Sequence, residues 1–352
     1  MKAGNPNNFA RYAWAVLGYN IFVILLGAFV RSSGSGAGCG SHWPLCNGEV
    51  LPRAPEIATL IEFSHRLTSG LALLLVGGLL LWARRLYAPG QPARAAAKWS
   101  MVFIVVEALV GAALVLLQLV GDNPALLRGI VIAMHLANTL LLLGALTLCA
   151  WHAAGGAPVQ LPQGAGAVSI WLGTGLLVVV CSSGAITALG DTLFPAASLA
   201  EGLQQDLDPG SHLFVRLRVW HPVLAIGTGV YLIVLARMWG LEGESLAVRR
   251  AARAMIVVVG LQWAGGALAV LLLAPLWIQI THLLMADVLW ILWVLLVARV
   301  HPARAAAAGL CGCAQHAGRA QRAHPLFGGR GAQGAHPALH PARAAAWSRR
   351  QS

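Results

Sequence analysis

Four histidines stand inside long apolar runs of the sequence: His65, His135, His221 and His282. Ionisable side chains are costly inside a membrane and usually mark a functional site there. Each histidine is expected about seven to nine residues from the outer end of its helix, or about 10–13 Å below the surface. Two histidines on facing helices can ligate a haem iron from both sides. Their common depth favours two haem pockets over four hydrogen-bonding core histidines.

Zinc is the competing interpretation, and the cysteines disfavour it. A zinc site needs four close nitrogen or sulfur ligands, whereas Cys149 and Cys181 are not placed beside the histidines and are expected to be core thiols. A haem also needs partners for its propionates. The candidates lie near the expected outer membrane edge, where snorkelling to the interface is the alternative: Arg31, Arg66, Arg216 and Arg218.

Glu62 precedes His65 by three residues, so the two are expected on one helix face. A carboxylate beside a bound haem can accept a proton or act as an electrostatic partner. An ion pair with Arg66 or Arg218 is the structural alternative. Two further acids within apolar runs receive no role from the sequence: Glu107 and Asp287.

The segment before the second apolar run contains Cys39-Gly-Ser-His-Trp-Pro-Leu-Cys46. It is expected on the oxidising side of the membrane, where a disulfide can persist. Cys39 and Cys46 are therefore predicted to pair directly above the His65 pocket. The pair is either a structural staple or a redox-active disulfide, because exposed disulfides are often the labile ones.

The elements that must position these residues are membrane-spanning helices. The chain of 352 residues is 58% hydrophobic and only 10% charged, against about 25% charged in soluble domains. A spanning helix needs roughly 20 apolar residues. The sequence thus predicts an all-α integral membrane protein with eight spans, the first a retained helix rather than a signal peptide: 12–31, 58–83, 98–120, 128–150, 168–189, 213–238, 254–273 and 276–299.

The basic residues predict the orientation of these spans. The net charge of +12 comes from Lys and Arg that cluster in alternate connections, whereas most loop acids fall in the others. By the positive-inside rule, both termini are expected in the cytoplasm of a multi-pass cell-membrane protein. Composition changes after the last span: residues 301–352 are rich in Ala, Arg, Gly, His and Pro and are predicted to be a disordered, basic, low-complexity tail.

The two halves of the apolar region look like copies of each other. Leu26-Gly27-Ala28 matches Ser183-Gly184-Ala185, residues 109–119 match 263–273, and the histidines recur in the same order. An even number of spans per half keeps the copies parallel. The sequence predicts two pseudo-symmetric four-helix bundles, residues 1–152 and 153–300.

These motifs together resemble haem A synthases, which oxidise a methyl group of haem O to the formyl group of haem A. The resemblance covers about residues 12–300. It is carried by Gly27-Ala28-Phe29-Val30-Arg31, Cys39…Trp43-Pro44-Leu45-Cys46, Glu62-Phe63-Ser64-His65-Arg66 and the single histidines of the fourth, sixth and eighth spans.

The resemblance implies that the N-terminal half holds the substrate haem O near His65 and His135, with Glu62 catalytic. The C-terminal half would hold a haem b cofactor, its iron between His221 and His282. The implied partners are membrane lipid, a haem O synthase, a quinol or other electron partner, and a second copy in a homo-oligomer. Nucleic acid is not among them.

Two departures from the family pattern stand out. Residues 190–212 contain no second cysteine pair, and Pro222 follows His221 where many members have arginine. Neither departure removes an iron ligand. The rival interpretations are a di-haem b cytochrome that passes electrons from quinol, with haems usually near both membrane faces, and a haem transporter. A transporter needs neither Glu62 nor the loop disulfide, so these features favour the enzyme.

Overall fold

The computed structural model describes residues 6–160, 163–240 and 245–320, with side chains as far as residue 300. Within that part of the chain there is no β-strand, and eight helical segments are long and apolar enough to cross a membrane. The predicted all-α membrane fold is confirmed. The spans are α1 (Pro6–Ser32), α2 (Ile57–Leu86), α3 (Pro92–Leu116), α4 (Leu126–Ala153), α5 (Ala165–Leu193), the segment Leu213–Gly240, α9 (Leu246–Leu271) and α10 (Leu276–Ala320).

The sixth span is built from short consecutive pieces. It comprises α7 (Leu213–Arg216), the 3-10 helix η2 (Leu217–Val219) and α8 (Trp220–Gly240). Two more short helices lie outside the spans, η1 (Ser35–Ala37) and α6 (Leu199–Leu207). Helices suit this chain because hydrocarbon offers no partner for backbone N–H and C=O groups, which must bond within the segment.

Local sequence sets several helix ends. Pro92 occupies the first turn of α3, where its missing N–H has no helical partner to lose. The side chains of Ser198 and Ser245 accept hydrogen bonds from the backbone N–H groups of Glu201 and Val248, and so cap α6 and α9.

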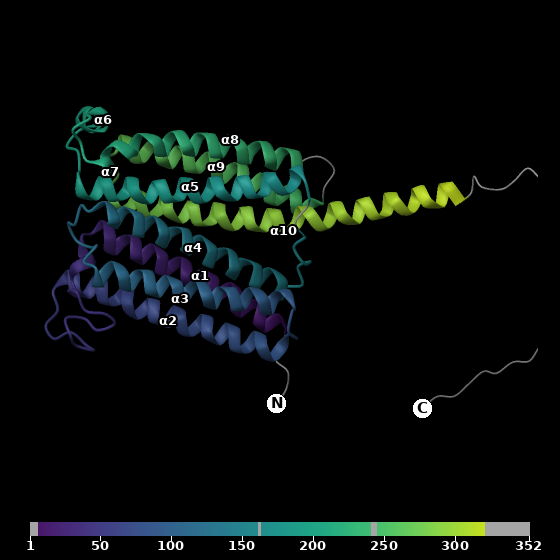
Figure 1. Ribbon diagram of the computed structural model, residues 1–352, viewed down its shortest axis with the longest axis horizontal. Coiled ribbons are helices and arrows are strands. Elements are labelled where there is room, and N and C mark those ends of the chain that lie inside the picture. Colours follow the sequence, from purple (N-terminus) through teal and green to yellow (C-terminus); the bar gives the residue numbers. More distant parts are fainter. Residues whose placement is uncertain (1–5, 161–162, 241–244, 321–352) are drawn as a thin grey trace, which may run out of the picture. The chain divides into compact units, whose positions relative to one another are not determined.

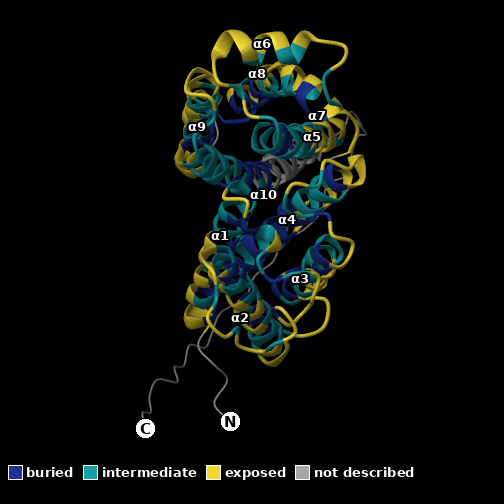
Figure 2. Cartoon of the chain, turned by 90° about the vertical axis from the view of Figure 1, so that its left-hand side faces the viewer, coloured by how far each residue is buried: buried dark blue, intermediate teal, exposed yellow. Residues whose placement is uncertain are grey.

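The spanning helices run side by side, and the α1–α2 connection lies at the same end as α6 (Figure 1). We call this end, which carries Cys39 and Cys46, the disulfide end. Helices α1 to α4 pack against one another, as do α5, α8 and α9, and α4 packs against α5. The view along the helices shows α1–α4 grouped apart from α5, α8, α9 and α10 (Figure 2).

Helix α10 packs against α5 and α8 through an aromatic contact. The Trp293 indole stacks on Trp239 of α8 with ring centroids 5.8 Å apart and donates to the Thr174 hydroxyl at 3.0 Å. A Cβ at Gly173 would lie 2.8 Å from the Trp293 ring. Gly173 therefore leaves the room that the buried indole occupies.

The helix assignment of α10 continues past the expected end of the last span, at residue 299, to Ala320. It thus extends into the segment predicted to be a disordered tail. The side chains of residues 301–320, and all of residues 321–352, lie outside the described part of the chain. The disorder of residues 321–352 stays a prediction.

The eight spans and the basic-residue bias give a testable topology. Reporter domains fused after residue 45, in the α1–α2 connection, and after residue 305, beyond the last span, are expected on opposite sides of the membrane. Activity of a periplasmic reporter at the first site and of a cytoplasmic reporter at the second checks the orientation. The same compartment for both fusions would contradict the even number of spans.

Candidate haem site

The four intramembrane histidines come from the second, fourth, sixth and eighth spans. They lie between six and nine residues from the disulfide end of their helices, which start at Ile57, Leu126, Leu213 and Leu276. At a rise of 1.5 Å per residue this is a depth of about 9–14 Å. All four rings therefore lie at a similar level and near one end of the helices.

Each of these rings faces a glycine on the preceding span. The contacts pair Gly27 with His65, Gly111 with His135, Gly184 with His221 and Gly265 with His282. A Cβ would lie only 3.0 Å from the His65 ring at Gly27, and 2.9 Å from the His221 ring at Gly184. The repeat seen in the sequence thus extends to the contacts that seat each histidine.

The His221 and His282 rings face each other across the C-terminal half. Their centroids are 6.5 Å apart and their planes cross at 84°. With nitrogen–metal bonds of about 2 Å, two imidazoles on opposite sides of one metal have centroids roughly 6 Å apart. The pair therefore has the separation that the two axial ligands of a haem iron require.

The ring nitrogens of the four histidines differ in their hydrogen-bond partners. The Nδ1 atoms of His65, His135 and His282 are buried without a hydrogen bond. His221 Nδ1 lies 3.0 Å from the Ser183 hydroxyl, which itself donates to Val180 O; the ring must then be the donor, which leaves its Nε2 free for a metal. No group of three or more potential metal ligands occurs among the described residues.

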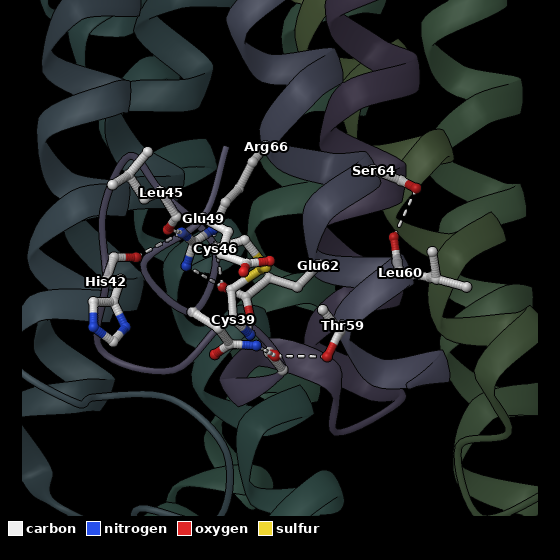
Figure 3. Close-up of a disulfide and its surroundings, with 12 residues drawn as sticks. Cys39, His42, Leu45, Cys46, Glu49, Thr59, Leu60, Glu62, Ser64 and Arg66 are labelled. Atoms are coloured by element: carbon white, nitrogen blue, oxygen red, sulfur yellow. Dashed lines mark hydrogen bonds and ion pairs between the residues drawn. A yellow bond between two sulfur atoms is a disulfide. The ribbon is translucent and has the colours of Figure 1, made fainter. Parts of the chain in front are cut away.

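Glu62 lies beneath the Cys39–Cys46 loop, and Figure 3 shows the contacts. Its Oε1 accepts from Arg66 Nε at 3.1 Å and Nη2 at 2.5 Å, and its Oε2 accepts from the Cys39 N–H at 2.8 Å. The side chain is only 4% exposed. The sequence predicted a carboxylate turned toward the His65 pocket, but the structure pairs it with Arg66 and the loop backbone instead.

Arg66 holds the same loop by a second set of bonds. Its Nη1 donates to the carbonyls of His42 at 2.6 Å and Leu45 at 2.5 Å, both within the segment that the Cys39–Cys46 disulfide closes. The predicted disulfide is present, and both sulfurs are buried. The ion pair and the disulfide together fasten the loop to α2, one helical turn before His65.

A close backbone contact completes the docking of the loop. A Cβ at Gly38 would lie 2.5 Å from the Ala58 backbone, and the Thr59 hydroxyl donates to Gly38 O at 2.7 Å. Only glycine allows the loop to approach the start of α2 this closely.

The other proposed propionate partners have different surroundings. Arg218 forms ion pairs with Asp191 at 3.0 Å and Asp206 at 2.8 Å, so its charge is already compensated. Arg31 donates to neutral groups, including Ala188 O at 2.7 Å and the Thr192 hydroxyl at 2.9 Å. Arg216 is exposed. Asp191 also interacts electrostatically with Arg31. Of these arginines, the exposed Arg216 has no ion pair among the described residues.

Comparison with known proteins places the chain in a family. Residues 10–294 match the family described as cytochrome oxidase assembly protein. The chain belongs to this family. The matched range includes all four histidines, Glu62 and the disulfide loop.

Individual relatives of this chain carry two different names. A Thermus thermophilus protein named protoheme IX farnesyltransferase is 49% identical over 292 residues, which are 83% of this chain and 48% of that protein. Proteins of Bacillus mycoides and Bacillus cereus named heme A synthase are each 42% identical over 120 residues, 34% of this chain and 38% of theirs. The chain spans about half the length of the Thermus relative, and less of the Bacillus ones.

Sequence reasoning missed one neighbour of the histidines. Glu107 Oε1 lies 3.4 Å from His135 Nδ1, although the sequence gave this acid no role. The signal was available in the repeat motif, because Glu107 precedes Gly111 by four residues and so shares its helix face. Gly111 is the residue that faces His135.

The glycine contacts predict that the position of the His221 ring, and with it any haem that the ring binds, is sensitive to packing at Gly184. Gly184→Ala should displace the His221 ring and lower or shift its haem absorbance. Gly175→Ala, on the same helix with no atom within 4 Å of the added Cβ, should keep the spectrum and raise stability by up to about 1 kcal/mol. Absorption spectra of the two purified variants check this. Equal spectra in both would show that the glycine does not position His221.

The loop geometry predicts that Cys39 and Cys46 resist alkylation until a reductant is added. Mass spectrometry of labelled protein, with and without reductant, checks the pairing. The disulfide joins residues seven apart, so a Cys39→Ser, Cys46→Ser variant should lose about 2–3 kcal/mol of loop stabilisation. Free reaction of both thiols without reductant would contradict the pairing.

Proposed function

We propose that this assembly protein is a haem A synthase, which oxidises a methyl group of haem O to a formyl group. The observation that carries the proposal is that the chain has two similar pairs of histidines, and that the residues around the two pairs differ. The C-terminal pair, His221 and His282, has the separation of two axial ligands and would hold a permanent haem b. The N-terminal pair, His65 and His135, lies beneath a buried carboxylate and a disulfide loop and would hold the substrate.

The name of the Thermus relative does not favour farnesyl transfer in this chain. That name belongs to a protein about twice as long as the matched segment, so it describes more than the part shared with this chain. Methyl oxidation, which the name of the Bacillus relatives indicates, suits paired intramembrane histidines better.

The residues of the N-terminal half have separate tasks in this proposal. His65 and His135 bind and orient the substrate haem. Each of two successive oxidations removes two electrons and two protons from the substrate and one water molecule, and replaces a methyl hydrogen by a hydroxyl group. The resulting gem-diol loses water to give the aldehyde, and the four electrons pass to an external electron carrier. Haem b, once bound, would supply a redox centre beside the substrate, while the protein supplies orientation and electrostatics.

Glu62 fits an electrostatic role in this reaction. Arg66 and the Cys39 N–H hold its carboxylate in place, one helical turn from His65. A fixed anion there would stabilise positive charge that develops at the methyl carbon. Since both oxygens already have donors, this role needs less rearrangement than acceptance of a proton.

The rival proposal, a di-haem b cytochrome that passes electrons from quinol across the membrane, fits the depth of the histidines less well. Such a carrier usually places haems near both faces, whereas all four histidines lie near the disulfide end. As a synthase the protein would lie in the cell membrane, with cytoplasmic termini. It would receive haem O from its synthase and exchange electrons with a quinol or another carrier.

The cofactor assignment predicts different losses from the two histidine pairs. His221→Ala or His282→Ala should remove or strongly perturb the low-spin b-type spectrum, because each deletes an axial ligand. His65→Ala should keep that spectrum and lose bound haem O and haem A. Extraction and mass analysis of the haems, together with absorption spectra, check both. A b-type spectrum that is unchanged in both His221→Ala and His282→Ala would contradict the assignment.

The Glu62 assignment separates the synthase from an electron carrier. Glu62→Gln keeps an acceptor for Arg66 and the Cys39 N–H but removes the charge, so the loop should stay fastened while haem A formation falls. Glu62→Ala should keep haem b and accumulate haem O or a hydroxylated intermediate. Each tenfold loss of rate corresponds to about 1.4 kcal/mol of transition-state stabilisation. Haem analysis of membranes measures the products.

The matched control is Glu49→Gln, which alters an acid of the same connection that pairs with the exposed Arg53. It should leave haem A formation unchanged. Wild-type amounts of haem A in both Glu62 variants would refute the catalytic role.

A further inference from the structure

Glu107 of α3 has a single basic partner among the described side chains. Its Oε1 lies 3.4 Å from His135 Nδ1. The contact is an ion pair by distance but is not aligned as a hydrogen bond, and Nδ1 has no other partner. The side chains are 20% and 30% exposed respectively, so the pair is only partly open.

Two neutral donors fix the direction of this carboxylate. Asn138 Nδ2 donates to Oε2 at 2.5 Å and also to Phe103 O at 2.9 Å. The Thr139 hydroxyl donates to Oε1 in a short hydrogen bond. Asn138 and Thr139 follow His135 by three and four residues on α4, so the histidine and both donors share a face. Two side chains of α4 therefore hold the Glu107 carboxylate next to His135 of the same helix.

The C-terminal half provides an internal comparison. Aligning Gly111 with Gly265 places Leu261 at the position of Glu107, and aligning His135 with His282 places Met285 and Ala286 at those of Asn138 and Thr139. None of the three polar residues recurs. His282 Nδ1 has no hydrogen bond, and the His221 ring has only neutral hydrogen-bond partners, the Ser183 hydroxyl and the Val180 backbone. The histidines and glycines are common to both halves. Among the described residues, a carboxylate within 4 Å of a histidine Nδ1 occurs only in the N-terminal half, whereas the buried Asp287 of α10, five residues after His282, makes no such contact.

We propose that Glu107 is a positioning residue that accepts the Nδ1–H of His135 and so makes the N-terminal histidine site electronically different from the C-terminal one. The inference rests on the proposed binding of haem at His65 and His135. A carboxylate on Nδ1 fixes the ring tautomer and orientation, and leaves Nε2 free for the iron. It also makes the imidazole a stronger electron donor, because the partner is an anion.

The consequence is a redox difference between two otherwise similar sites. A stronger axial donor stabilises the oxidised iron, so Glu107 lowers the midpoint potential of the haem at the N-terminal site. Leu261, at the position of Glu107 in the C-terminal half, has no charge and would not lower the midpoint potential of a haem there. Glu107 would therefore make a haem bound by His65 and His135 easier to oxidise than it would be without this carboxylate.

The test is a redox titration of the full-length, haem-loaded protein, with haem O supplied by a co-expressed farnesyltransferase. The N-terminal haem is identified as the one lost in His65→Ala. Glu107→Gln should raise the midpoint potential of that haem and leave that of the C-terminal haem unchanged. Ser183→Ala, which alters the partner of His221, should leave the N-terminal haem unchanged. An unshifted N-terminal potential in Glu107→Gln would overturn the inference.

A second variant covers the case in which Glu107→Gln binds no N-terminal haem. Glu107→Asp keeps the charge with a shorter reach. Retention of that haem by Glu107→Asp alone supports a role for the charge, because glutamine preserves the volume of the side chain. Loss in both variants would overturn the inference, because Glu107 would then be required for haem binding itself rather than for the potential of the bound haem. A wild-type protein that already lacks a His65-dependent haem would instead contradict the proposed function.

Discussion

The contact between a histidine and a glycine on the preceding span is the constraint on which the site depends. Inside hydrocarbon an imidazole has no water to bond, so it must be enclosed by neighbouring helices. Glycine lets α1 approach α2, and α5 approach α8, until the His65 and His221 rings fill the gap. The ring then has little freedom, which is what an axial ligand needs.

Charge at the disulfide end is arranged differently in the two halves. Glu62 lies one turn from His65, and the repeat places Arg218 at the same distance from His221. The first pairs with Arg66 of its own helix and fastens the loop, whereas the second gathers Asp191 and Asp206 from α5 and α6. Buried charges must be paired. One turn before the histidine, the N-terminal half has the acid Glu62, which pairs with a base, and the C-terminal half has the base Arg218, which pairs with two acids.

Periodicity and depth could be predicted from the sequence because they depend on position along one helix. The spans, the histidine level and the repeat are of this kind. The ion pair of Glu62 with Arg66 was an alternative that the sequence offered, because the two residues lie four apart on one helix. The partners of Arg31 could not be predicted, because its long side chain reaches another element: it bonds α5 through Ala188, which lies 157 positions away along the chain. The repeat placed Glu107 on the face of Gly111, but the contact with His135 depends on how α3 packs against α4.

The parallel repeat has a consequence for the origin of the chain. Four spans per half return the chain to its starting side, so a duplicated half inserts in the same orientation as its parent. A bundle of four helices that formed a parallel homodimer would already contain both histidine pairs, and the connection between Ala153 and Ala165 is all that fusion requires. After fusion the two copies could accumulate different mutations, which a symmetric dimer forbids. Glu107 in one copy and Leu261 in the other are the kind of divergence that gene duplication permits.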